Sequence, residues 1–149
     1  MKNRIEDLLG LSTHDLWIGT FHGLCHRLLR RHSQEAGLPH SFQILDTDDQ
    51  LRIVKRIIRG EALDESRWPA RQVLWYINAQ KEEGRRARNL PDSGDPFERQ
   101  MIKVYRAYED LCDRSGLVDF AELLLRGLEL FEERQEILDF YRQKFQYVL

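Results

Sequence analysis

The sequence predicts a mainly α-helical fold, and three observations support this prediction. Apolar residues recur at intervals of three and four along most of the 149-residue chain, as they do on one face of a helix. Capping residues and glycines mark where several of these helices begin and end. Two short segments, residues 16–20 and 146–149, instead carry the compact apolar pattern of β-strands. We therefore expect a multi-helix unit with two short strands.

Six helices are expected from the apolar spacing. They cover, in chain order, residues 21–36, 47–60, 69–84, 95–116, 119–128 and 137–145. Thr47 with Gln50, and Asp119 with Glu122, have the spacing of capping boxes, while Asp95 followed by Pro96 is the strongest start signal. The fifth helix is expected to bury Phe120, Leu123, Leu124 and Leu128. Residues 84–94 show no periodicity and are expected to be irregular.

Composition and charge exclude several classes of protein. Lys and Arg number 23 and Asp and Glu 25, so the net charge of −2 excludes a polycation that coats nucleic acid by charge alone. Residues 20–88 carry 13 basic and 9 acidic residues, a net +4, whereas residues 89–149 carry 8 and 13, a net −5. We expect no membrane span and no signal peptide. Two cysteines, Cys25 and Cys112, are expected to be buried thiols of a reducing, cytoplasmic compartment.

No catalytic or metal-binding pattern stands out. The sequence lacks the phosphate-binding pattern G-x-x-x-x-G-K-[ST], the nucleophile pattern G-x-S-x-G and the metalloprotease pattern H-E-x-x-H. His22 and His26 have a spacing that could bind zinc, but no third ligand is evident, which favours a cap and a surface histidine. We therefore predict no catalytic residue and no metal within this chain.

Nucleic-acid contact has three candidate sources. Two basic groups could bind phosphate, although solvated helix faces are the more ordinary interpretation: Arg27, Arg30 and Arg31, and Lys81, Arg85, Arg86 and Arg88. Trp68, Trp75 and Tyr76 could stack on bases, although helical spacing favours the core. Thr20 and His22 follow a predicted strand at the positive end of a helix, where ligands commonly bind.

Four elements together resemble a known family. They read GTFHGL at residues 19–24, FQILDTDDQ at 42–50, WYINAQK at 75–81 and GLVDFAELL at 116–124. These resemble, in order and spacing, elements of superfamily 1 DNA helicases of the UvrD/Rep/PcrA type. The resemblance covers nearly the whole chain and is weakest at residues 84–94.

The resemblance implies a piece of an ATP-dependent 3′–5′ DNA helicase acting in DNA repair and replication. Residues 1–22 and 141–149 would belong to core subdomain 1A, the latter leading into the Walker B strand, and residues 23–140 would form helical subdomain 1B. The two short strands would be left over from the parallel α/β ATPase core. ATP and Mg²⁺ would bind outside this chain, so the chain alone would be inactive.

The resemblance also implies partners and contact residues. Thr20 and His22 would lie on the path of single-stranded DNA, and Lys81 near the duplex junction. Arg85 and Arg86 are DNA-contact candidates on charge alone. The rest of the helicase, subdomains 1A, 2A and 2B, and DNA repair proteins would be further partners. The alternatives are a free-standing α-helical protein-interaction module and, less favoured, a helix-turn-helix regulator, because no short helix pair carries a concentrated basic helix.

Overall fold

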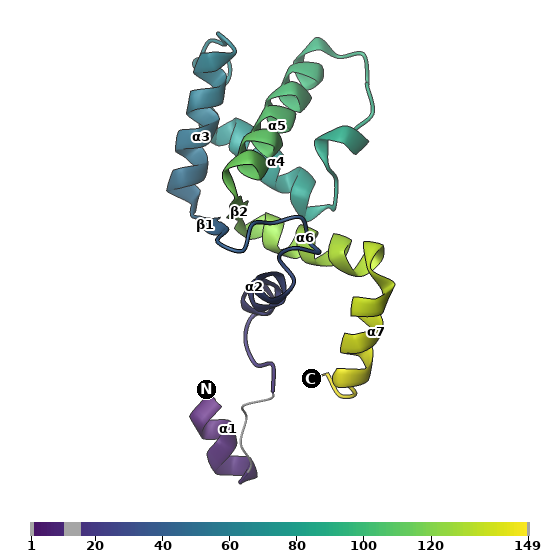
Figure 1. The fold of residues 1–149 in the computed structure, drawn as a ribbon. Helices are drawn as coiled ribbons and strands as arrows, with labels where there is room; N and C mark the ends of the chain where they lie inside the picture. The colour runs from purple at the N-terminus through teal and green to yellow at the C-terminus, as the bar shows by residue number, and fades with distance from the viewer. Residues whose placement is uncertain (1, 11–15, 149) are drawn as a thin grey trace.

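Helices dominate the computed structural model, which describes residues 2–10 and 16–148 (Figure 1). Within these residues the α-helices are α1 (Lys2–Leu9), α2 (Phe21–Arg31), α3 (Thr47–Gly60), α4 (Ala70–Glu82), α5 (Pro96–Ser115), α6 (Phe120–Glu133) and α7 (Gln135–Lys144). A short 3₁₀-helix, η1 (Ala87–Asn89), lies in the segment expected to be irregular. The prediction of a mainly α fold is confirmed. None of the helices in the described residues is long and apolar enough to span a membrane.

The six predicted helix starts lie within two residues of the observed ones. The Asp95 carboxylate accepts a hydrogen bond from the Phe97 amide at 3.0 Å, and Pro96 opens α5. The cap of α3 is Asp46, one residue before the predicted Thr47, and its carboxylate accepts from the Asp49 amide at 2.8 Å. Either side chain can satisfy a free amide of the first turn, and the aspartate is the one placed to do so.

The two strands are not where the sequence predicted them. β1 (Gln43–Leu45) and β2 (Leu117–Asp119) pair in parallel, with Ile44 opposite Val118. Residues 16–20 and 146–148 form no strand, and Leu149 lies outside the described residues. A strand requires a neighbour to accept its backbone hydrogen bonds, and neither segment has one in the described part of the chain. β1 and β2 are each other's neighbour, and they lead into helices α3 and α6 respectively.

The core consists of two clusters of buried side chains. The first joins α3, α4 and α5 and includes Val54, Ile58, Ile77, Val104 and Tyr105. The second joins α2, α6 and α7 and includes Leu28, Leu29, Phe42, Leu123 and Tyr141. The small sheet connects them, because Leu45 of β1 belongs to the first cluster and Val118 of β2 to the second.

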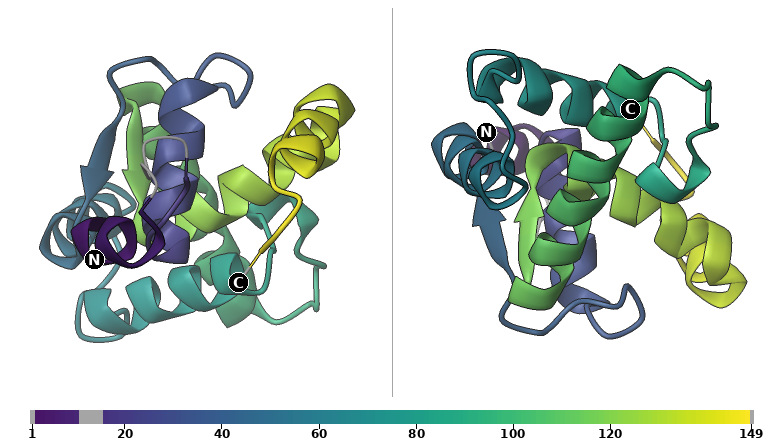
Figure 2. Two further views of the ribbon diagram at one scale, coloured as in Figure 1. Left: turned by 90° about the horizontal axis from the view of Figure 1, so that it is seen from below. Right: turned by 90° about the horizontal axis from the view of Figure 1, so that it is seen from above.

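Helix α6 lies between these two groups. It contacts α4 on one side and α2 on the other, as Figure 1 shows. Helix α7 extends to one side of the remaining helices (Figure 2, yellow). The position of α6 makes its first turn a junction between elements that are far apart in the sequence.

Several residues expected in the core are exposed. Phe120 is 48% exposed, Leu124 37% and Leu128 52%, so of the four apolar residues predicted to be buried on α6 only Leu123 is buried. The three exposed residues are spaced by four and form a stripe of their own, which no helix of the described residues buries. Trp75 on α4 is 74% exposed, whereas Trp68 and Tyr76 pack partly against the first cluster.

Gly116 ends α5 in a conformation that only glycine adopts at low cost. Its φ is +64°, and a Cβ atom there would lie 2.7 Å from Cγ of Pro39. We predict that Gly116→Ala lowers the free energy of unfolding by about 1–3 kcal/mol, because it adds backbone strain and a clash. Urea denaturation measures the change. Gly60→Ala is the matched control, since nothing lies within 4 Å of a Cβ there and its φ is not positive. Equal effects of the two substitutions would contradict this explanation.

Candidate functional site

The start of α2 presents an exposed polar turn. The Thr20 hydroxyl accepts a hydrogen bond from the Gly23 amide at 3.2 Å and thereby caps the helix. His22 follows in the first turn, and Phe21 beside it is 81% exposed. The backbone amides of such a first turn carry partial positive charge, which favours contact with an anion. Both residues predicted at this position, Thr20 and His22, are therefore accessible.

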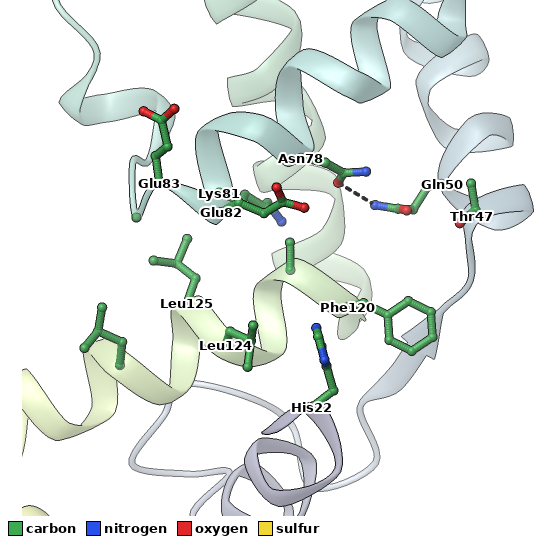
Figure 3. A pocket seen from close by; sticks show the side chains of 13 residues that line it. His22, Thr47, Gln50, Asn78, Lys81, Glu82, Glu83, Phe120, Leu124 and Leu125 are labelled. Atoms are coloured by element: carbon green, nitrogen blue, oxygen red, sulfur yellow. Dashed lines mark hydrogen bonds between the residues drawn. The ribbon is translucent and has the colours of Figure 1, made fainter. Parts of the chain in front are cut away.

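A cavity of about 680 Å³ adjoins this turn (Figure 3). It is bounded by the starts of α2, α3 and α6 and by the end of α4. The lining residues are His22, Thr47, Gln50, Asn78, Lys81, Glu82, Glu83, Gly84, Phe120, Ala121, Leu124, Leu125 and Leu128. Its sides are apolar toward α6 and polar toward α3 and α4.

His22 and Phe120 meet at this cavity. Their ring centroids are 6.2 Å apart and the rings stand at 86°, an edge-to-face arrangement. The two residues come from α2 and α6 and are almost one hundred positions apart in the sequence. Phe120 is the residue of this site that the sequence prediction missed, because it was assigned to the core. Its spacing of four from Leu124 and Leu128 places the three residues on one stripe but does not show whether another helix covers that stripe.

Behind the cavity lies a buried group of charges. The Lys81 ammonium at the end of α4 contacts Asp119 Oδ2 at 2.9 Å and Glu122 Oε2 at 2.8 Å. All three side chains are 5% exposed or less. Asp119 is also the cap of α6, since its Oδ1 accepts from the Glu122 amide at 2.7 Å. Lys81 thus holds the first turn of α6 against α4.

Two arginines complete this ion-pair cluster, which we define as Lys81, Arg86, Arg126, Asp119, Glu122, Glu109, Glu129 and Asp113. Arg86 contacts Glu122 and Glu129 at 2.6 Å each and Glu109 at 3.0 Å. Arg126 contacts Glu122 at 3.0 Å and Asp113 at 2.7 Å. The cluster therefore ties α4, the segment around η1, α5 and α6 together.

The pKa shifts show that pairing outweighs burial in this cluster. Burial opposes the charged form of Glu122, but the Lys81 ammonium and the Arg86 guanidinium hold its pKa well below the ordinary range. The pKa of Lys81 is raised, because Glu122 and Asp119 outweigh the effect of its own burial. Burial also raises the pKa of the Cys112 thiol, to about 12, which disfavours its thiolate form.

The structure places Lys81 and Arg86 in the interior rather than on an exposed basic surface. Both were candidates for DNA contact, but Lys81 is 4% and Arg86 9% exposed, and internal carboxylates take up their charges. Burial and internal pairing therefore keep these two charges away from the exposed surface. Arg85 is exposed and pairs with Glu83 at 3.0 Å, a surface contact that solvent and other anions can replace.

The basic residues of α2 are also engaged within the fold. The guanidinium of Arg30 lies 3.8 Å from the ring centre of Phe42, and its Nε donates to His26 Nε2 at 3.1 Å. Arg27 lies over the Trp17 ring at 4.5 Å. In the described residues no group of three or more His, Cys, Asp and Glu side chains is arranged to hold a metal ion.

A family model and individual relatives point to the same kind of protein. Residues 1–149 match the family described as UvrD/REP helicase N-terminal domain. The chain is 54% identical over 149 residues to DNA helicase II of Escherichia coli, covering all of this chain and 21% of that protein. It is 35% identical over 149 residues to the ATP-dependent DNA helicase PcrA of Bacillus subtilis, covering 99% of the chain and 20% of that protein. The chain thus spans about a fifth of the length of these relatives.

Because the pKa of Glu122 is depressed in the folded chain, the free energy of unfolding depends on pH. Because its pKa is lower when folded than its ordinary 4.5, Glu122 stabilises the fold above that pH, and the contribution is lost as the pH falls. We predict that the advantage of the wild type over Glu122→Gln in unfolding free energy shrinks between about pH 5 and pH 2.5, by up to about 1.4 kcal/mol per pH unit.

Urea denaturation at a series of pH values measures this difference. Glu132→Gln is the control, because Glu132 is exposed on the same helix and makes no ion pair in the described part of the chain. A difference between wild type and Glu122→Gln that stays constant with pH would contradict the assignment.

Proposed function

The chain belongs to the UvrD/REP helicase N-terminal domain family, and from this premise we propose that it forms a DNA-contacting wall of an ATP-dependent 3′–5′ DNA helicase. The observation that carries the proposal is the meeting of His22 and Phe120 at one open cavity beside the start of α2. An exposed aromatic ring next to a capped helix start suits a single strand, whose bases stack and whose phosphates seek backbone amides.

Contact with the DNA backbone and stacking on a base are assigned to different parts of the site. The first turn of α2, with Thr20 and His22, faces the sugar-phosphate backbone, and exposed Arg85, which follows the lining residue Gly84, adds a cation. Phe120 offers its ring to a base. This chain would contribute a small number of contacts, consistent with its net charge of −2.

In the described residues the cavity does not suit the phosphates of ATP, and no group of three or more His, Cys, Asp and Glu side chains is arranged to hold a metal ion such as Mg²⁺. The cavity wall carries Glu82 and Glu83, and the charge of its lysine, Lys81, is already neutralised by buried carboxylates. The sequence contains no phosphate-binding loop of the G-x-x-x-x-G-K-[ST] type. We therefore propose that ATP binds elsewhere in the helicase and that this chain alone does not hydrolyse it.

The division into subdomains is supported by exposed apolar residues. Leu16, Phe21, Tyr147 and Val148 are 45–89% exposed and lie in or beside the segments assigned to the core subdomain 1A, residues 1–22 and 141–149. Residues 1, 11–15 and 149 of those segments lie outside the described part. Neighbouring subdomains would cover these side chains, while residues 23–140 form subdomain 1B. Further proposed partners are the duplex junction, subdomains 2A and 2B, and DNA repair proteins, in the cytoplasm.

A second candidate function is a protein-interaction module, favoured by one observation. Trp75 is 74% exposed on α4, and an exposed tryptophan is a frequent anchor of protein interfaces. Such a module would bind its partner without dependence on nucleic-acid phosphates.

A salt titration of single-stranded DNA binding tests the proposed function. We predict that Phe120→Ala weakens binding of a fluorescent oligothymidylate by about 1–3 kcal/mol, because a base loses its stacking partner. The slope of log K against log salt should not change, since no phosphate contact is removed. Fluorescence anisotropy at several salt concentrations measures both quantities.

Phe140→Ala serves as the matched control. Phe140 on α7 is 47% exposed, nearly the same as Phe120, but lies outside the cavity. Equal losses in the two variants would argue against a base contact at Phe120. A wild-type chain that binds no single-stranded DNA even at low salt would favour the protein-interaction module.

A further inference from the structure

The polar wall of the cavity includes two side-chain amides that have no role in the proposed function. Gln50 of α3 and Asn78 of α4 both line the cavity, and Figure 3 shows the hydrogen bond between their side-chain amides. Gln50 is only 4% exposed, although its amide carries two donors and one acceptor that require partners.

A chain of hydrogen bonds from the ion-pair cluster fixes how these amides are oriented. Asp119 Oδ2 accepts from Lys81 and lies 2.7 Å from the Tyr108 hydroxyl. An ionised carboxylate can only accept a hydrogen bond, so the Tyr108 hydroxyl is the donor in its hydrogen bond with Asp119. The Tyr108 oxygen is then the acceptor for Gln50 Nε2 at 3.1 Å. The NH₂ end of Gln50 must therefore face Tyr108.

The orientation of Asn78 follows from that of Gln50. The second N–H of Gln50 Nε2 donates to Asn78 Oδ1 at 3.1 Å, so the Asn78 carbonyl faces Gln50. Two groups are then left without a hydrogen-bond partner in the described residues: the NH₂ group of Asn78 and Oε1 of Gln50. The Gln50–Asn78 pair thus presents one free NH₂ group and one free carbonyl oxygen, both oriented by the hydrogen bonds to Tyr108 and between the two amides.

The charges at the cavity favour a neutral ligand over an anionic one. Glu82 and Glu83 line it, and the ammonium of Lys81 is neutralised within the fold. A phosphate would be repelled by these carboxylates. A neutral flat ring with hydrogen-bonding groups on its edge would not be, and the exposed Phe120 ring offers it a stacking surface.

We propose that Asn78 and Gln50 hydrogen-bond the edge of a nucleobase of single-stranded DNA whose face packs on Phe120. This inference rests on the proposed function and extends it to two residues. The Asn78 amide donates to a carbonyl or ring nitrogen of the base, and Gln50 Oε1 accepts from an N–H. Every base edge carries both kinds of group, so the site accepts different bases.

Substitution of Asn78 separates the base contact from backbone contacts. Asn78→Asp keeps the size of the side chain and an acceptor for Gln50, but removes the free donor. Its affinity for an oligothymidylate should fall about three- to tenfold. Its affinity for an abasic oligomer of the same length should equal that of the wild type, because that oligomer has no base for Asn78 to contact. A loss of affinity for the abasic oligomer would instead report repulsion between the new carboxylate and the phosphates.

Asn89→Asp is the matched control, with the same change of charge at an exposed asparagine of η1. It should bind both oligomers as the wild type does. In ¹⁵N-labelled chain, the side-chain NH₂ resonances of Asn78 should shift on addition of oligothymidylate and not of the abasic oligomer.

Three results would overturn the inference. If Asn78→Asp lost affinity equally for both oligomers, or for neither, then Asn78 would make no base contact. If the wild type bound the abasic oligomer as tightly as oligothymidylate, the base contacts of Asn78, Gln50 and Phe120 would all be wrong, while a contact of the chain with the DNA backbone would stand. A wild-type chain that bound neither oligomer would overturn the proposed function and this inference with it.

Discussion

The contact of Lys81 with Asp119 and Glu122 is the interaction on which the rest of the structure depends. Asp119 is the last residue of β2, the cap of α6 and a partner of both Lys81 and Tyr108. Burying these charges costs solvation free energy, and the cost is offset because every charge of the group has partners within 3.0 Å. Removing one partner of such a group typically costs about 3–5 kcal/mol. The geometry of the first turn of α6 is set by this constraint.

The arrangement of both sides of the cavity depends on this first turn of α6. Phe120 follows Asp119 directly and meets His22 because α6 is held between α4 and α2. On the opposite wall, Asp119 orients Tyr108, and Tyr108 orients Gln50 and through it Asn78. One buried carboxylate thus determines where the aromatic surface lies and which amide groups remain free beside it.

The sequence predicted the features that depend on neighbouring residues and missed those that depend on distant ones. Asp95, Pro96 and Gly116 mark the ends of α5 because caps and left-handed glycines act within a few residues. The strands were placed wrongly because pairing of residues 43–45 with 117–119 joins segments over seventy positions apart. Lys81 and Arg86 were assigned to a surface because their carboxylate partners lie on α5 and α6. Phe120 was assigned to the core because an apolar stripe does not reveal whether another helix covers it.

The most direct measurement is the proton–proton nuclear Overhauser effect between the rings of His22 and Phe120. It should be present in the wild type and in Lys103→Met, which removes an exposed ion pair with Glu61. It should be lost or strongly reduced in Lys81→Met, measured under conditions where circular dichroism shows that the helices persist. An undiminished cross-peak in folded Lys81→Met, or its absence from the wild type, would contradict the conclusion that the buried lysine positions the cavity.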